Sequence, residues 1–174
     1  MRKILILCLL PAILLAMVAC CVEHCKGFPE ELTDYLPYKQ GQIITFVNEH
    51  NDTLSMQVQN TWKTNPYVEK ACKGACGANY GFLFSVIDNF SFGYKSIDCS
   101  MDGSRDLREG FSFYISFSPI SSISIFSPEI VDTINAINQD ESAPISNVEI
   151  VKGKGINSFT DKNLNCTWKL SENN

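Results

Sequence analysis

Acidic side chains are the residues of this chain whose spacing could support catalysis. Asp98, Asp102, Asp106 and Glu109 lie in a polar segment over 98–110. Two carboxylates on either side of a glycosidic bond can cleave it without histidine. The same composition is also typical of a solvated loop, because acidic residues beside glycine favour turns. We favour the loop and keep a carboxylate-based glycan hydrolase as the least favoured of three hypotheses.

Other catalytic groups are scarce. The chain has two histidines, His24 and His50, and histidine is the usual general base near neutral pH. The sequence contains no Gly-x-Ser-x-Gly, no phosphate-binding loop and no His-Glu-x-x-His. We therefore predict no catalytic residues, no cofactor and no enzyme.

The first twenty residues have the pattern of an export signal. Arg2 and Lys3 precede an apolar run over 4–17, which is short for a membrane-spanning helix of about 20 residues and typical of a signal peptide. Ala19 is the small residue that a peptidase needs before its cut, and Cys20 follows it. A thiol at this place resembles the nucleophile that takes a diacylglycerol in bacterial lipoproteins, and two or more acyl chains anchor a protein stably. A lipidated Cys20 is favoured over an ordinary secretory signal or a single anchoring helix.

Three parts follow from this pattern: a signal peptide over 1–19, a tether over 20–34 and a single domain over 35–174. The tether contains Cys21, His24 and Cys25, which could hold a soft metal. Metal ligands need a fold to fix them, so no metal site is predicted. The chain has 14 basic and 19 acidic side chains without a basic cluster, and nucleic acid is therefore not an expected partner.

Four further cysteines, Cys72, Cys76, Cys99 and Cys166, lie in the body of the chain. In an exported protein they are candidates for structural disulfides, with three pairings open. The spacing of Cys72 and Cys76 would also suit half a zinc site, but Cys99 and Cys166 do not form a second close pair. We favour disulfides and leave the pairing open.

Two triplets resemble the Asp-Thr-aliphatic acceptor of the general O-glycosylation systems of Bacteroides-like bacteria. They place Thr53 and Thr133 as candidate acceptors, each after an aspartate and before Leu54 or Ile134. Ordinary strand residues are the alternative interpretation at both positions.

Apolar residues alternate with polar ones along most of the chain after Gly41, which is the period of half-buried strands. The clearest run is 111–117, where phenylalanine and isoleucine alternate with serine and tyrosine. Strands are predicted over 43–47, 53–62, 111–117, 122–125, 145–151 and 165–170, with a hairpin over 80–94 that turns at 88–89.

The segment 128–138 has two interpretations. Ser127 and Pro128 are typical of a helix start, and isoleucines follow at helical spacing. Isoleucine and valine also favour strands, and a turn at 139–142 would make a hairpin with 145–151. We lean towards the strand. Together these segments predict an all-β protein, either an antiparallel sandwich or an open or half barrel of about eight strands. One short helix near 128–138 is the alternative to a strand there.

The stretch Tyr35-Leu-Pro-Tyr-Lys-Gln-Gly-Gln-Ile-Ile-Thr-Phe-Val-Asn-Glu-His-Asn-Asp-Thr-Leu resembles the opening of a group of small, uncharacterised, β-rich lipoproteins of Bacteroidetes. These tend to have Tyr-x-Pro-Tyr, a glycine, a strand that ends in phenylalanine, and Asp-Thr. The later Ser146–Val151 segment also resembles their Asn-Val-hydrophobic strand. The resemblance implies a location in the cell envelope and a β-rich fold, and it implies no catalytic residue.

The favoured function is a non-catalytic binding or scaffolding domain held by the lipid on Cys20. The predicted location is the bacterial envelope, at the outer membrane on its periplasmic side. The partner would be an unknown protein or an apolar ligand. The many aromatic side chains could fill a core or line a cleft for an apolar ligand, and filling the core is the more common outcome.

Replacing Cys20 tests the prediction that this residue carries the lipid anchor. We expect Cys20→Ala to release the protein from membranes, because the thiol that carries the lipid is gone. Fractionation of cells followed by immunoblotting measures the shift from the membrane to the soluble fraction. Continued membrane attachment of the variant would contradict lipidation at Cys20.

Overall fold

The computed structural model describes residues 28–64, 67–70, 75–77, 79–88, 93, 95–103 and 110–171. Most of these residues are in strands. In chain order the elements are α2 (Glu30–Thr33), β1 (Ile43–Val47), β2 (Thr53–Lys63), β3 (Tyr67–Lys70), β4 (Ala75–Gly77), β5 (Asn79–Asp88), β6 (Ser96–Gly103), β7 (Phe111–Ser118), β8 (Ser121–Ser127), β9 (Thr133–Ile137), β10 (Ile145–Val151), β11 (Gly155–Asp161) and β12 (Cys166–Leu170).

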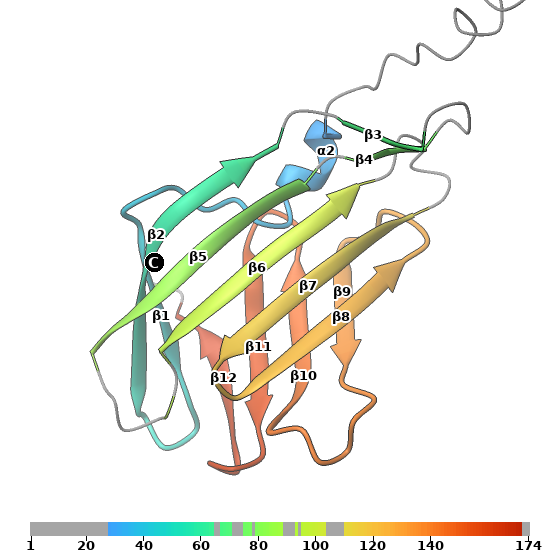
Figure 1. The fold of residues 1–174 in the computed structure, drawn as a ribbon. Coiled ribbons are helices and arrows are strands. Elements are labelled where there is room, and N and C mark those ends of the chain that lie inside the picture. Colours follow the sequence, from blue (N-terminus) through green and yellow to red (C-terminus); the bar gives the residue numbers. More distant parts are fainter. Residues whose placement is uncertain are drawn as a thin grey trace, which may run out of the picture.

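Ten of these strands form one antiparallel sheet in the order β8-β7-β6-β5-β2-β1-β12-β11-β10-β9, and β3 pairs with β4 separately. The large sheet folds over at β1 and β2, so that its first five strands form a layer in front of the last five (Figure 1). The predicted all-β antiparallel architecture is therefore confirmed, as a barrel-like sandwich. Within the described ranges, no helix is long and apolar enough to cross a membrane.

The two edge strands lie close together and almost close the sheet. The amide nitrogen of Asn138, just after β9, donates to the Ser121 hydroxyl of β8 at 3.4 Å and to the Ser122 carbonyl at 3.5 Å. It also donates to the Ile145 carbonyl of β10 at 3.1 Å. The Asn138 side chain thus links the two edge strands of the sheet, β8 and β9.

Period-two alternation decides which side chains face inward. In β7 the residues Phe111, Phe113, Ile115 and Phe117 are buried, whereas the serines and the tyrosine between them are partly or fully exposed. The predicted strand at 111–117 is confirmed, and its apolar side forms part of the space between the layers.

The interpretation of 98–110 as a polar link is wrong for its first part. β6 pairs with β5 and β7 along its whole length, and Ile97, Cys99 and Met101 are buried. The polar residues that favoured a loop occupy the outward side of this strand. The predicted hairpin over 80–94 is thus right for its first strand, β5, whereas most of 89–94 lies outside the described residues.

The open interpretation of 128–138 is settled in favour of the strand. β9 pairs with β10, with Ile134 and Ala136 buried and their neighbours exposed. The hydroxyl of Ser127 donates to the Glu129 carbonyl at 2.7 Å, so it does not cap a helix. Alternation against β10 therefore outweighs the helical spacing of the isoleucines.

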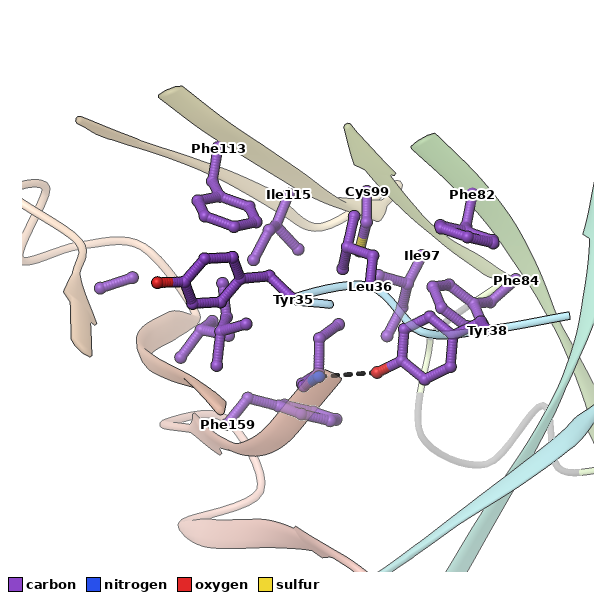
Figure 2. Packing of buried hydrophobic residues seen from close by; sticks show 14 of the residues in the cluster. Tyr35, Leu36, Tyr38, Phe82, Phe84, Ile97, Cys99, Phe113, Ile115 and Phe159 are labelled. Carbon is purple, nitrogen blue, oxygen red and sulfur yellow. Dashed lines mark hydrogen bonds between the residues drawn. The ribbon is translucent and has the colours of Figure 1, made fainter. Parts of the chain in front are cut away.

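The segment before β1 packs between the two layers. Phe28, Leu32, Tyr35, Leu36 and Tyr38 are all buried. Figure 2 shows the segment with Tyr35 and Tyr38 between strands of the front layer and strands of the rear layer. The predicted tether over 20–34 is therefore too long, because its part from residue 28 belongs to the core.

Both tyrosine hydroxyls of this segment bond to backbone groups of the rear layer or its connections. The Tyr35 hydroxyl donates to the Val131 carbonyl and accepts from the Val131 N–H at 2.9 Å. The Tyr38 hydroxyl accepts from the Ile156 N–H at 2.6 Å. The two hydroxyls thus pair with backbone groups of Val131 and Ile156. Buried backbone groups need such partners, so these bonds hold the segment against the rear layer.

Candidate functional site

An open cleft of about 520 Å³ lies beside the end of β12. Its walls come from three places that are far apart in the sequence: Pro37, Tyr38 and Gln42 before β1, the Gly153-Lys154 turn after β10, and Leu170 with Ser171 at the end of β12. Ile44 and Asn157 complete the described lining. The volume falls within the range of about 300–1,000 Å³ that is typical of small-ligand sites.

The cleft lies at the place where the end of β12 meets β1 and β11. Leu170 is opposite Phe46 of β1, and the Ser171 N–H donates to the Thr45 carbonyl at 2.8 Å. β12 ends at Leu170 and the described residues end at Ser171, whereas β1 begins at Ile43 and β11 at Gly155. Residues of β1, β11 and the end of β12 meet at this cleft.

A tight turn places a cation at the rim of the cleft. The Lys154 N–H donates to the Val151 carbonyl at 3.0 Å, and the Gly153 N–H donates to the Asp34 carbonyl at 2.7 Å. The turn is thereby held on the segment that packs inside the sandwich. Lys154 is exposed, and it is the charged residue among the described residues of the lining.

Tyr38 forms the inner wall of the cleft. Its ring contacts Phe82 and Phe84 edge to face, at 5.5 Å and 4.9 Å between ring centres. Burial raises the pKa of the Tyr38 hydroxyl far above its ordinary value, and the nearby Cys99 adds to the rise. The hydroxyl therefore keeps its proton at neutral pH and acts as a neutral hydrogen-bonding group.

Asn157 forms the wall opposite β1. The β10–β11 pairing shifts register between Glu149 and Ile150, so Asn157 is an extra residue in its strand. Its amide nitrogen donates to the Glu149 carboxylate, which also accepts from the Ser158 hydroxyl at 3.4 Å. These bonds fix the Asn157 side chain at the wall of the cleft.

Two of the four predicted disulfide cysteines are free thiols. Cys99 and Cys166 are buried and unbridged. Burial raises the pKa of both thiols, which keeps them protonated and unreactive at neutral pH. Cys72 and the side chain of Cys76 lie outside the described part of the chain, as does Cys20. Bridging of Cys72 and Cys76 therefore stays a prediction.

The candidate carboxylates do not converge where the structure describes them. Asp98 and Asp102 lie four residues apart on β6, which is about 13 Å along a strand. Paired glycosidase carboxylates lie about 5–9.5 Å apart. Burial raises the pKa of Asp98, whose Oδ1 is buried without a hydrogen-bond partner in the described part of the structure. Asp106 and Glu109 lie outside it.

The two candidate glycosylation residues are both accessible. Thr53 and Thr133 are exposed, and each is the first residue of its strand, β2 or β9. Exposure is what a modifying enzyme requires, and modification at either residue stays a prediction.

The aromatic side chains mainly fill the core. The phenylalanines of β5, β7 and β11 and Trp168 of β12 are almost inaccessible where the structure describes their side chains. They contact one another and the N-terminal segment, as between Tyr35 and Phe113 at 5.6 Å or Phe46 and Phe159 at 5.4 Å. Tyr38 is the aromatic residue in the described lining of the cleft.

Comparison of the chain with protein-family models, with curated proteins and with solved structures finds no match. The cleft must therefore be interpreted from its own residues. The sequence singled out the Tyr-x-Pro-Tyr segment, but nothing in it indicated that this segment lies beside the turn at Gly153 and Lys154.

The close approach of Tyr38 to β11 yields a stability test. A Cβ on Gly155 would lie 2.0 Å from the Tyr38 hydroxyl oxygen, and Gly155 also has φ +86°. Gly153 has φ +79°, and a Cβ there would meet nothing within 4 Å. We expect Gly153→Ala to lower the free energy of unfolding by about 1–2 kcal/mol through backbone strain. Gly155→Ala should cost a further ~1–3 kcal/mol through the clash.

Urea unfolding followed by tryptophan fluorescence measures both variants. Gly153→Ala serves as the control for the positive φ alone. Equal losses in the two variants would show that Tyr38 does not pack against Gly155 as described.

Proposed function

We propose that this chain is a bacterial envelope lipoprotein whose β domain binds a ligand in the cleft beside β12 without converting it. The observation that carries the proposal is the cleft itself, whose walls mix one cation, amides and hydroxyls with apolar surface. Such a mixture of apolar walls and a few polar groups is typical of ligand sites.

The membrane part of the proposal rests on the sequence around Cys20. The domain begins no later than Phe28, which is buried in the core. Eight residues from Cys20 to Phe28 span at most about 28 Å when fully extended. A lipid on Cys20 would therefore hold the domain close to the bilayer surface, as expected for a protein that acts at the outer membrane on its periplasmic side.

Binding is favoured over catalysis by the groups at the cleft. The described lining offers Lys154, the Asn157 and Gln42 amides and the Ser171 and Tyr38 hydroxyls. The Tyr38 hydroxyl holds its proton too tightly to act as a base near neutral pH. The other polar groups are suited to hydrogen bonds and to attraction of an anion.

A mixed polar lining also favours a polar ligand over an apolar one. The aromatic side chains that would line an apolar cavity instead pack against one another in the core. We therefore place the carrier of an apolar ligand second to a binder of a polar, anionic ligand.

Reversing the charge at the rim tests the binding role. The full chain and its Lys154→Glu variant are purified from membranes in mild detergent and compared by native mass spectrometry. We expect a non-covalent ligand mass on the unchanged chain that is lost or reduced in the variant, because an anion would now meet a like charge. Lys95→Glu is the matched control, since Lys95 is exposed and precedes β6 in the other layer.

A ligand mass that persists in Lys154→Glu and in Lys95→Glu alike would contradict binding in the cleft. A ligand recovered in a chemically altered form after incubation would contradict the non-catalytic role.

A further inference from the structure

The outer side of the front layer carries two aromatic side chains that do not belong to the core. Trp62 of β2 is opposite Gly81 of β5. Gly81 is opposite Ser100 of β6, which is opposite Tyr114 of β7, so these four residues form one row across the sheet. Tyr114 exposes 45% of its side chain, and Trp62 is partly exposed. No described helix or strand lies over this side of β5 to β8 (Figure 1).

A glycine brings the Trp62 ring towards Tyr114. Phe82 is buried in the core, so a Cβ on the preceding Gly81 would point to the outer side of the layer. It would lie 2.4 Å and 2.7 Å from two atoms of the Trp62 ring. The ring thus extends from β2 over the backbone of β5. From there Tyr114 is two strands away, which is roughly 10 Å at about 4.8 Å per strand.

Hydrogen-bonding groups lie beside this row. Ile97 and Cys99 are buried, so Asp98 between them points to the outer side. Asp98 is opposite Ser116 of β7, and its Oδ1 has no hydrogen-bond partner among the described residues. A carboxylate accepts hydrogen bonds from hydroxyls, and serine hydroxyls both donate and accept. The aromatic pair therefore has acceptors and donors next to it.

The charge of this side selects against an anion. The strands β5 to β8 contain no lysine or arginine. The outward positions of β7 and β8 are mostly serines, namely Ser112, Ser116, Ser122 and Ser124. A neutral ligand with many hydroxyls complements such a surface, whereas an anion would find its cation at Lys154 in the cleft beside β12.

We propose that the outer side of the front layer binds a neutral glycan, whose sugar rings pack on Trp62 and Tyr114 and whose hydroxyls bond to Asp98 and Ser100. A pyranose ring presents apolar C–H groups on its faces and hydroxyls at its rim. Packing of a face on an aromatic ring removes apolar surface from water and leaves the hydroxyls free to bond. Two aromatic rings roughly 10 Å apart suit linked sugars better than a single sugar. The site is separate from the cleft, and the inference does not rest on the function proposed for it.

Titration of the full chain with a defined oligosaccharide tests the proposal. The probe is the tetramer of β-1,4-linked N-acetylglucosamine, followed by isothermal titration calorimetry in a detergent without a sugar head group. We expect saturable binding that added salt leaves unchanged, because the probe carries no charge. Tyr114→Ala should weaken binding about two- to tenfold through loss of the ring contact. Tyr114→Phe should keep the affinity, and Asp98→Asn should weaken it because an amide accepts fewer hydrogen bonds.

Two control variants locate the site. Ile137→Ala removes an exposed apolar side chain from β9 of the rear layer and should leave the affinity unchanged, as should Lys154→Glu. No saturable binding of the tetramer, or equal affinity of Tyr114→Ala and the unchanged chain, would overturn the proposal. Binding that is lost in Lys154→Glu and kept in Tyr114→Ala would place the sugar in the cleft and overturn it as well.

A protein partner on the same surface gives a different result. A concentration-dependent dimer in analytical ultracentrifugation that Tyr114→Ala abolishes, together with no binding of the tetramer, would make this side an interface between two copies. The glycan assignment would then fall, whereas the ligand proposed for the cleft would be unaffected.

Discussion

The packing of residues 28–38 between the two layers is the constraint on which the rest of the structure depends. The segment brings Phe28, Leu32 and Leu36 into the space between the layers, where their burial removes apolar surface from water. Its two tyrosines then bond to Val131 and Ile156 in the connections and strands of the rear layer. Without it, the phenylalanines of the front layer would face an unfilled space, since Tyr38 packs on Phe82 and Phe84.

The cleft depends on the same segment. Tyr38 closes it on the inner side, and the Asp34 carbonyl holds the Gly153-Lys154 turn at its rim. The residues that position the candidate site are thus the residues that connect the domain to the membrane anchor proposed at Cys20. If Cys20 carries the proposed lipid, the anchor would lie within about twenty residues of the segment that forms part of the core and of the cleft.

The sequence predicted the fold class because alternation is local. The alternation of apolar and polar residues over 111–117 is enough to predict a strand, and the structure confirms it. β6 was missed although Ile97, Cys99 and Met101 alternate, because the acidic and hydroxyl side chains between and beside them are typical of a loop. Burial of 28–34 has no local signal: the segment is mostly irregular, and only contact with both layers makes its side chains interior. The cleft has no local signal either, since its walls come in part from β1, β11 and β12, which become neighbours only through the order of the sheet.

Hydrogen exchange at Val131 and Ile156 tests the central role of the N-terminal segment most directly. Both amides donate to a tyrosine hydroxyl of that segment, so each is protected only while the segment is in place. The account predicts that both exchange as slowly as the amide of Phe113 in the centre of β7, through opening of the domain as a whole. Exchange of both amides at the rate of an unstructured peptide, while Phe113 stays protected, would show that the segment is not part of the folded core.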